Sequence, residues 1–243
     1  MEKIFLKDSI LNWKAMIEGG SYHVQEGWDR PYEYLEVAYN IINLHKKELE
    51  LIDVISNLKR AIDNRIKKLS RDYNFKGMNQ FGFPKDNFSK LECLGLAKPL
   101  MLDKIVSVRN IIEHQFKNPP DAKSCEEFAE LVWYFLKSTD EKTRCRAKSI
   151  ILKHDYKSGY ESVYWLNFNV ENEFDWSKID VFGWVSSAHM IDDNESKFCI
   201  NCSEIKSRDL LTDDSIFISG TCIMDTLHTA DVITAFFVAD SHL

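Results

Sequence analysis

The sequence predicts an α+β protein in which an N-terminal antiparallel helical bundle is followed by a small C-terminal all-β domain, a barrel or a sandwich. In the first part of the chain, apolar residues recur every three or four positions, as they do on one face of a helix. After about Lys142 the period falls to two, which is typical of half-buried strands. We therefore expect two domains, residues 1–142 and residues 143–243.

The first half of the bundle is expected to hold a short helix and a long one. The short helix covers residues 7–18 and ends at Gly19-Gly20. The long helical pattern runs from Pro31 to about Tyr73, and we expect one break in it because an unbroken helix would measure roughly 60 Å.

The second half of the bundle begins after residues 74–90, whose Gly, Pro and Asn residues indicate a loop. A helix over residues 98–117 ends at Asn118-Pro119-Pro120. The last helix runs to about Lys137, and either Ser124 or the preceding Asp121 can cap it.

The strands of the second domain are short and are separated by turn-rich pieces. Alternation is clearest between Tyr164 and Val170, where apolar residues take every second position. Similar runs occur at residues 149–152, 181–186, 197–202, 216–224 and 232–238.

Composition excludes several classes of protein. With 44% hydrophobic residues, 9 Gly and 5 Pro, the chain is neither disordered nor collagen-like. No apolar run approaches the roughly 18 residues of a membrane span, and the N-terminus mixes charged and apolar residues, unlike a signal peptide. We expect a soluble, cytoplasmic protein with no membrane partner, whose 6 Cys are mostly small buried hydrophobic residues.

The net charge of −7 is distributed unevenly along the chain. Residues 1–155 carry 26 Lys and Arg against 23 Asp and Glu, whereas residues 156–243 carry 5 against 15. The helical part is therefore mildly basic, and the β part is strongly acidic. A nucleic-acid partner is expected to bind the helical part, because the acidic part would repel phosphates.

Arg109 lies in the middle of the apolar stripe of the helix predicted at residues 98–117. On an ideal helical wheel, five apolar residues fall within about 60° of it, namely Leu102, Ile105, Val106, Ile112 and Phe116. A guanidinium at such a position needs a carboxylate, a phosphate or a protein interface. Asn110 and His114, four residues apart, can address one ligand together.

A purely structural interpretation of these residues stays open. Glu113 is four residues after Arg109, so the two side chains can form an ordinary ion pair. His114 can be a surface histidine near the C-terminal end of the helix dipole. It also lies about 140° from Arg109 on the wheel, so fraying of the helix or a second copy of it is needed to bring the pair together.

The string Arg109-Asn110-Ile111-Ile112-Glu113-His114 resembles the motif of the HEPN superfamily (higher eukaryotes and prokaryotes nucleotide-binding domains). The motif consists of Arg, a polar residue, a spacer and His, and the residue after the Arg is frequently Asn. The resemblance covers roughly residues 31–140, including the run GLAKPLMLDKIVSVRN, the segment DVISNLKRAIDNRIKKL and the helix EEFAELVWYFLK. It does not extend to the β-rich remainder.

This resemblance implies a homodimeric helical bundle in which two motifs face each other. Many members are metal-independent ribonucleases of toxin, anti-phage or RNA-processing systems, and others have lost activity and only bind. We expect this chain to be such an endoribonuclease, acting in a stress, toxin–antitoxin or anti-phage defence system. His114 would act as general base or acid, Arg109 would hold the scissile phosphate and Asn110 would orient the phosphate or the imidazole. Attack by a ribose 2′-hydroxyl needs no metal.

Two alternatives to a nuclease remain open. The chain can be a catalytically inactive HEPN-like module that binds or assembles with RNA, a nucleotide or a protein. Alternatively, the β domain is the functional part and the helices only dimerise it. For a member of a toxin–antitoxin system, a protein partner such as an antitoxin would be expected.

A basic helical region supports RNA as the partner. It contains His45, Lys46, Lys47, Lys59, Arg60, Arg65, Lys67, Lys68 and Arg71. Lys59, Arg60 and Lys67 are the preferred phosphate contacts because no acidic residue adjoins them, although Asp63 is four residues from both lysines. An ordinary solvated helix face is the alternative.

Other motifs give no support for a metal or a cofactor. Cys199 and Cys202 have the spacing of half a zinc site and His189 is near in sequence, but no second pair of ligands follows. The sequence lacks the glycine-rich phosphate loops and the nucleophile elbow. We expect neither a metal nor a cofactor.

Overall fold

The computed structural model describes residues 2–18, 22–24, 26–98, 100, 101, 103, 104, 106, 107, 110, 120–154, 164–170, 174–191, 198–207, 214–223 and 226–239. This part of the chain holds six α-helices and a seven-stranded antiparallel sheet, which confirms the α+β class. The residues group into two compact units. We call residues 24–75 and 85–146 the helical unit, and residues 1–23, 76–84 and 147–243 the sheet unit.

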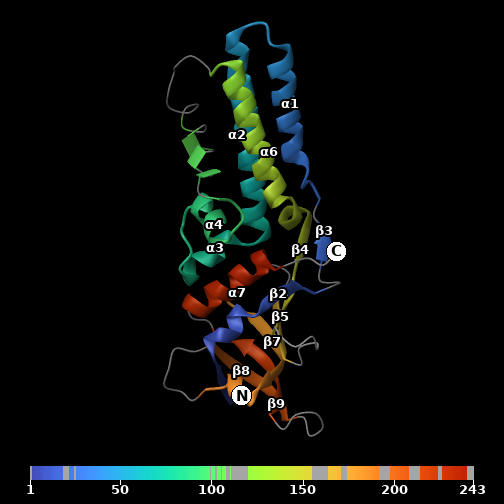
Figure 1. Cartoon of the computed structure of the whole chain (residues 1–243), viewed down its shortest axis with the longest axis vertical. Coiled ribbons are helices and arrows are strands. Elements are labelled where there is room, and N and C mark those ends of the chain that lie inside the picture. Colours follow the sequence, from blue (N-terminus) through green and yellow to red (C-terminus); the bar gives the residue numbers. More distant parts are fainter. Residues whose placement is uncertain are drawn as a thin grey trace. The chain divides into compact units, whose positions relative to one another are not determined.

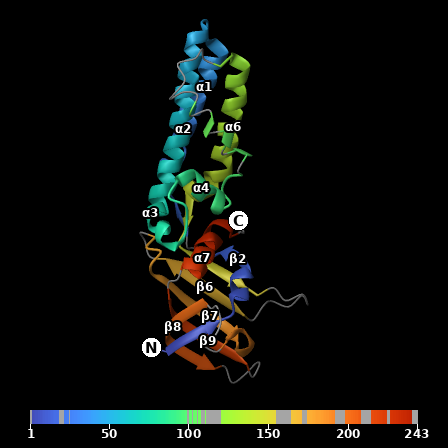
Figure 2. The same ribbon diagram turned by 90° about the vertical axis from the view of Figure 1, so that its left-hand side faces the viewer.

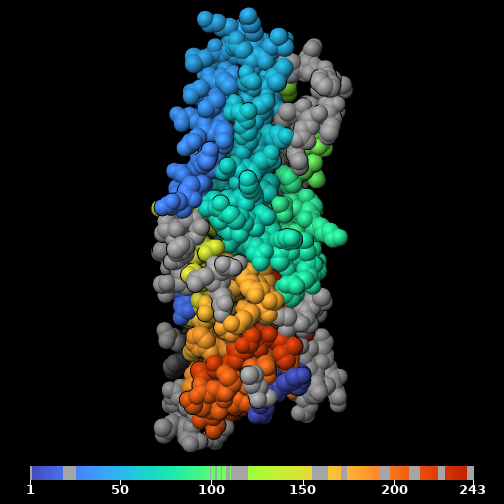
Figure 3. All heavy atoms as spheres, turned by 180° about the vertical axis from the view of Figure 1, so that it is seen from behind, coloured from blue at the N-terminus to red at the C-terminus, as the bar shows by residue number. Residues whose placement is uncertain are grey.

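Three long helices of the helical unit lie side by side (Figure 1): α1 (Arg30–Leu44), α2 (Leu51–Asp72) and α6 (Ala122–Arg144). The predicted break is confirmed, since residues 45–50 separate α1 from α2 and include a short 3₁₀ helix, η2 (Glu48–Glu50). Asp121 caps α6 by accepting a hydrogen bond from the Ser124 backbone N–H at 2.7 Å. In Figure 3, α1 (blue) and α2 (cyan) form a continuous surface.

The segment predicted as a loop, residues 74–90, holds short helices instead. It contains α3 (Phe75–Met78), the 3₁₀ helix η3 (Asn79–Phe81) and the start of α4 (Asn87–Cys93). Asp86 caps α4, because its carboxylate accepts the backbone N–H of Ser89 at 2.7 Å. Local capping therefore outweighs the Gly and Pro content from which a loop was predicted.

Arg65 is fully buried between the long helices, with 0% of its surface exposed. Its guanidinium forms an ion pair with Asp140 of α6 at 2.9 Å. It also donates hydrogen bonds to the Thr139 and Thr143 hydroxyls and to the carbonyls of Leu136 and Trp28. Arg65 thus connects α2 to α6 and to the segment before α1.

Tyr32 of α1 completes this network by donating its hydroxyl proton to the other Asp140 oxygen at 2.7 Å. Burial and the hydrogen bond to Asp140 raise the pKa of Tyr32, so it stays a neutral donor. Burial lowers the pKa of Arg65, and its bond to Asp140 opposes that shift. One carboxylate therefore joins α1, α2 and α6.

The sheet unit contains seven strands in the order β1-β8-β9-β7-β6-β5-β2, all paired antiparallel. The strands are β1 (Glu2–Leu6), β2 (Lys14–Ile17), β5 (Ser149–Lys153), β6 (Trp165–Val170), β7 (Ile179–Ser186), β8 (Phe198–Ser207) and β9 (Ser215–Cys222). A separate two-stranded sheet consists of β3 (Tyr22–Val24) and β4 (Cys145–Ala147).

Strands β1 and β2 occupy opposite edges of the sheet although only seven residues separate them. Five of these residues form the 3₁₀ helix η1 (Asp8–Asn12), so the connection spans at most about 20 Å. The edges of a flat seven-stranded sheet would be about 29 Å apart. The sheet must therefore curl until its two edges approach each other.

Helix α7 (Thr226–Val238) packs against this sheet through β2, β5 and η1 (Figure 2). Its sequence is apolar on nearly all sides, and most of its second half is buried. The Phe236 ring contacts the buried ring of Trp176, with centroids 5.6 Å apart. The helix therefore supplies a large part of the apolar core of this unit.

Two predictions about this unit are wrong. Residues 7–18 form η1 and β2 rather than one helix, and residues 232–238 lie in α7 rather than in a strand. A short apolar run does not by itself distinguish a buried strand from a buried helix, and here burial on all sides favours the helix. The sheet unit is consequently not built of strands alone, and it includes residues from the N-terminus.

Gly183 allows β6 and β7 to approach closely, and we expect Gly183→Ala to destabilise the sheet unit by about 1–3 kcal/mol. The backbone φ is +153°, and an added Cβ would overlap the Trp165 carbonyl oxygen and lie 3.0 Å from the Leu166 Cα. Thermal unfolding of the whole chain measures the effect. Asn169→Ala, at an exposed position of β6, is the control and should change stability by less than about 0.5 kcal/mol.

Candidate functional site

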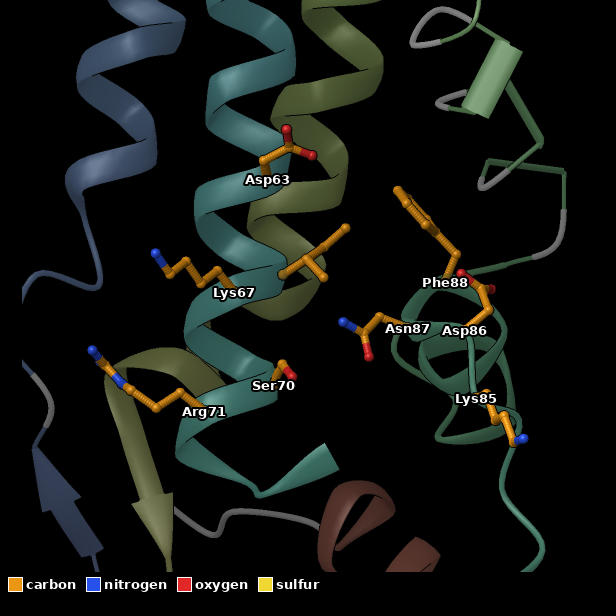
Figure 4. A pocket seen from close by; sticks show the side chains of 9 residues that line it. Asp63, Lys67, Ser70, Arg71, Lys85, Asp86, Asn87 and Phe88 are labelled. Carbon is orange, nitrogen blue, oxygen red and sulfur yellow. The ribbon is translucent and has the colours of Figure 1, made fainter. Parts of the chain in front are cut away.

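A pocket of about 610 Å³ lies in the helical unit, between α2 and the start of α4 (Figure 4). This volume is within the range of small-molecule and nucleotide sites. Polar and charged side chains make up most of its lining, which consists of Asp63, Ile66, Lys67, Ser70, Arg71, Lys85, Asp86, Asn87 and Phe88.

The α2 wall of the pocket follows from helix periodicity. Asp63, Lys67 and Arg71 are four residues apart and share one exposed face of the helix. The opposite face of α2 is apolar and buried, so these charged side chains must point outward. Arg71 is 74% exposed, and its Nε donates to Asp72 at 3.1 Å.

The α4 wall is held by the cap of that helix. Asp86 accepts hydrogen bonds from the backbone N–H and the hydroxyl of Ser89, at 2.7 and 2.8 Å. Burial raises the pKa of Asp86, but the hydrogen bonds from Ser89 outweigh burial and lower that pKa overall. The Lys90 ammonium is buried and donates a hydrogen bond to the Lys85 carbonyl at 3.2 Å. This bond fixes the segment that leads into α4.

The cations of the pocket lie around its rim and do not converge on one point. In Figure 4, Asn87 points from α4 toward α2, whereas Lys67 and Arg71 extend from α2 away from Asn87. Lys85 points away from α2 on the other side. Three cations face two carboxylates, Asp63 and Asp86, so the rim carries a small positive excess. This arrangement suits an extended chain of phosphates better than one compact anion.

Of the three basic residues predicted to contact phosphate, Lys67 lines the pocket and Arg60 is exposed on the same face, two helical turns earlier. Arg60, Lys67 and Arg71 form a line of about 16 Å along α2. Lys59 is half-buried and is not part of the pocket lining.

The predicted basic region needs one correction, because Arg65 and Lys68 do not belong to the surface. Arg65 is the buried partner of Asp140, and Lys68 is buried in an ion pair with Asp72 at 2.8 Å. Both face the interior because they occupy the apolar side of α2, beside Leu58, Ile62 and Leu69.

Arg109 and His114, the two fixed positions of the predicted motif, lie outside the described residues. Asn110, between them, is described as helical and exposed. The prediction that Arg109, Asn110 and His114 act together is therefore still a prediction.

No metal site is found in the described part of the chain, where no three His, Cys, Asp or Glu side chains lie close enough to share an ion. Cys199 is half-buried and Cys202 is buried, and both lie on β8 outside any disulfide. Burial raises the pKa of the Cys202 thiol to about 11, which disfavours the thiolate that binds metals.

The pocket was not predicted, since only Lys67 among its lining residues was a preferred site residue. Lys85, Asn87 and Phe88 were not predicted as site residues because residues 74–90 were interpreted as a loop. The spacing of Asp86 and Ser89 is a capping signal that would have revealed α4.

Comparisons of the chain with models of protein families, with curated proteins and with solved structures found no match. Among the helices that the structure describes, none combines the length and the apolar character needed to span a bilayer.

Proposed function

We propose that the chain is a cytoplasmic RNA-binding protein and a metal-independent endoribonuclease of the HEPN type, acting in a stress, toxin–antitoxin or anti-phage defence system. The observation that supports RNA binding most directly is the spread of Lys67, Arg71 and Lys85 around the rim of the pocket. Cleavage is supported by the motif at Arg109–His114.

Binding would follow the line of cations along α2. Arg60, Lys67 and Arg71 would each contact a phosphate of a single strand laid along the helix. The pocket beside this line offers Asn87 for hydrogen bonds and the Phe88 ring for stacking on a base. Ser70 adds a hydroxyl on the opposite wall.

Cleavage would proceed by attack of a ribose 2′-hydroxyl on the adjacent phosphorus. His114 would accept the hydroxyl proton, or donate a proton to the departing 5′-oxygen, and Arg109 would stabilise the charge that develops on the phosphate. Asn110 would orient the phosphate or the imidazole. The products are a 2′,3′-cyclic phosphate and a 5′-hydroxyl, and a homodimer would supply two copies of the motif.

We expect the double variant Lys67→Gln/Arg71→Gln to bind single-stranded RNA more weakly than the wild type. The slope of log affinity against log salt should fall by about 0.7 for each phosphate contact removed. Fluorescence anisotropy with a labelled single-stranded RNA of mixed sequence, measured at several salt concentrations, tests this.

The matched control for this experiment is Lys123→Gln, which removes one exposed cation at the start of α6. It should leave affinity and salt slope unchanged. Equal weakening by this control would mean that binding depends on charge in general. Unchanged binding by the double variant would remove the pocket from RNA recognition.

Cleavage is tested separately by incubating the purified chain with mixed RNA in EDTA. The proposal expects fragments that end in a 2′,3′-cyclic phosphate. Binding without fragments would favour the alternative of an inactive RNA-binding module. A chain that neither binds nor cleaves RNA would contradict both the nuclease and the RNA-binding module.

A further inference from the structure

Three aromatic rings in the sheet unit pack around His189, which the RNA proposal does not use. The ring centroid of His189 lies 5.1 Å from that of Trp13, 5.3 Å from that of His154 and 5.5 Å from that of Tyr164. Trp13 also contacts His154, with centroids 5.1 Å apart. His189 closes the 3₁₀ helix η4 (Ser187–His189), which directly follows β7.

His189 and Ser186 form a reciprocal cap of η4. The Ser186 backbone N–H donates to Nδ1 of His189 at 3.2 Å, and the Ser186 hydroxyl accepts the Ala188 N–H at 3.1 Å. A backbone N–H can only donate, so Nδ1 must be unprotonated. The neutral ring therefore carries its proton on Nε2, and a second proton on Nδ1 would break this bond.

The capped segment also holds the N-terminal edge strand. The Lys7 backbone N–H donates to the His189 carbonyl at 2.9 Å, and the Ile191 N–H donates to the Phe5 carbonyl at 3.0 Å. A β-bridge joins Leu6 to Met190 between them. Residues 189–191 therefore pair with the side of β1 that faces away from β8.

On balance, the surroundings of the His189 ring oppose its protonation. Burial is the main cause that lowers the pKa of His189, and His154 and Lys7 add to it. Asp214 is the one carboxylate among the described residues that raises this pKa. That carboxylate already accepts hydrogen bonds from the hydroxyls of Ser186 and Tyr164.

We infer that His189 is a proton-operated latch on the N-terminal edge of the sheet. The neutral imidazole caps η4 and keeps residues 189–191 paired with β1. Protonation removes the acceptor of the Ser186 N–H and places a second cation beside Lys7, so the pairing opens. This inference concerns the sheet unit and does not depend on RNA binding or cleavage.

The direction of the pH effect follows from linkage. An open or unfolded His189 has a pKa near 6.5, and the closed one has a lower pKa. The latch is therefore fully closed above pH of about 6.5 and weakens as the pH falls toward the lower value. Between the two values, the opening constant should rise about tenfold for each pH unit.

Amide hydrogen exchange of the whole chain, followed by NMR from pH 7.5 to pH 5, tests the latch. The protection factors of the Lys7 and Ile191 amides should fall together as the His189 ring titrates below pH 6.5. His189→Gln keeps a cap acceptor that does not titrate, so it should retain protection at pH 5. His189→Ala should lose protection at every pH.

His45→Gln, in the helical unit, is the control for loss of a histidine and should leave the pH profile of Lys7 and Ile191 unchanged. The inference is overturned if His189 titrates at or above pH 6.5. It is also overturned if His189→Gln opens with the wild-type pH dependence, because another group would then control the opening.

Discussion

Arg65→Ala is expected to lower the unfolding free energy of the helical unit by about 3–5 kcal/mol, because it removes one partner of a buried ion pair. The guanidinium is fully buried and bonds to Asp140, to two hydroxyls and to two carbonyls. Alanine would leave the Asp140 carboxylate with Tyr32 and with the solvent-exposed ammonium of Lys137, which is 3.6 Å away. It would also leave a cavity between α2 and α6.

Urea denaturation of the whole chain measures this loss, and hydrogen exchange by mass spectrometry assigns it to α2 and α6. Arg60→Ala is the matched control, since it removes an exposed arginine from the same helix and should change stability by less than about 0.5 kcal/mol. Arg65→Ala with the stability of the Arg60 variant would show that the network contributes nothing to the fold.

His114→Ala is expected to reduce RNA cleavage by about 10²–10⁴-fold, the usual contribution of a general acid or base. Binding of RNA should change little, because the proposed phosphate contacts on α2 remain. The measurement is the initial rate of cleavage of mixed RNA in EDTA by equal amounts of wild type and variant. Arg109→Lys should also be impaired, because lysine cannot form the two parallel hydrogen bonds of a guanidinium with phosphate.

His23→Ala serves as the control, because it removes a histidine that lies outside both the motif and the basic helical region. Its cleavage rate should match that of the wild type. Equal cleavage by the wild type and His114→Ala, or cleavage by neither, would remove His114 from catalysis under these conditions. Cleavage lost equally in the His23 variant would indicate damage to the fold instead.

The long helices could be predicted from the sequence because each buries one apolar stripe with a clear period. The break between α1 and α2 was expected from the length of the pattern, and Asp121 was one of two residues, with Ser124, expected to cap α6. Strands β5 to β9 could likewise be predicted, since each contains a short alternating or apolar run close to turn-rich residues. Residues 7–18 and α7 could not, because their conformation depends on partners far away in the chain, such as β5 for β2.

From the sequence, only one residue of the candidate site, Lys67, was predicted as a preferred phosphate contact. Lys67 was preferred because no acidic residue adjoins it in the sequence, whereas Lys85 and Asn87 become candidate site residues only when α4 is placed beside α2. Arg65, like Arg109, is an arginine amid apolar neighbours on its predicted helix. Sequence alone could not reveal that Asp140, 75 residues later, neutralises Arg65.

The placement of β1 and β2 at the two edges of the sheet dictates an order of folding during synthesis. Glu2 pairs with Cys202, and β2 pairs with β5, so both N-terminal strands emerge from the ribosome long before their partners. At a synthesis rate of about 5–20 residues per second, β8 is synthesised on the order of 10–40 s after β1. The helical unit, whose long helices all end by Arg144, can assemble in that interval. The exposed charges of Glu2, Lys3 and Lys14 then disfavour pairing of β1 and β2 with other chains until β5 and β8 have been synthesised.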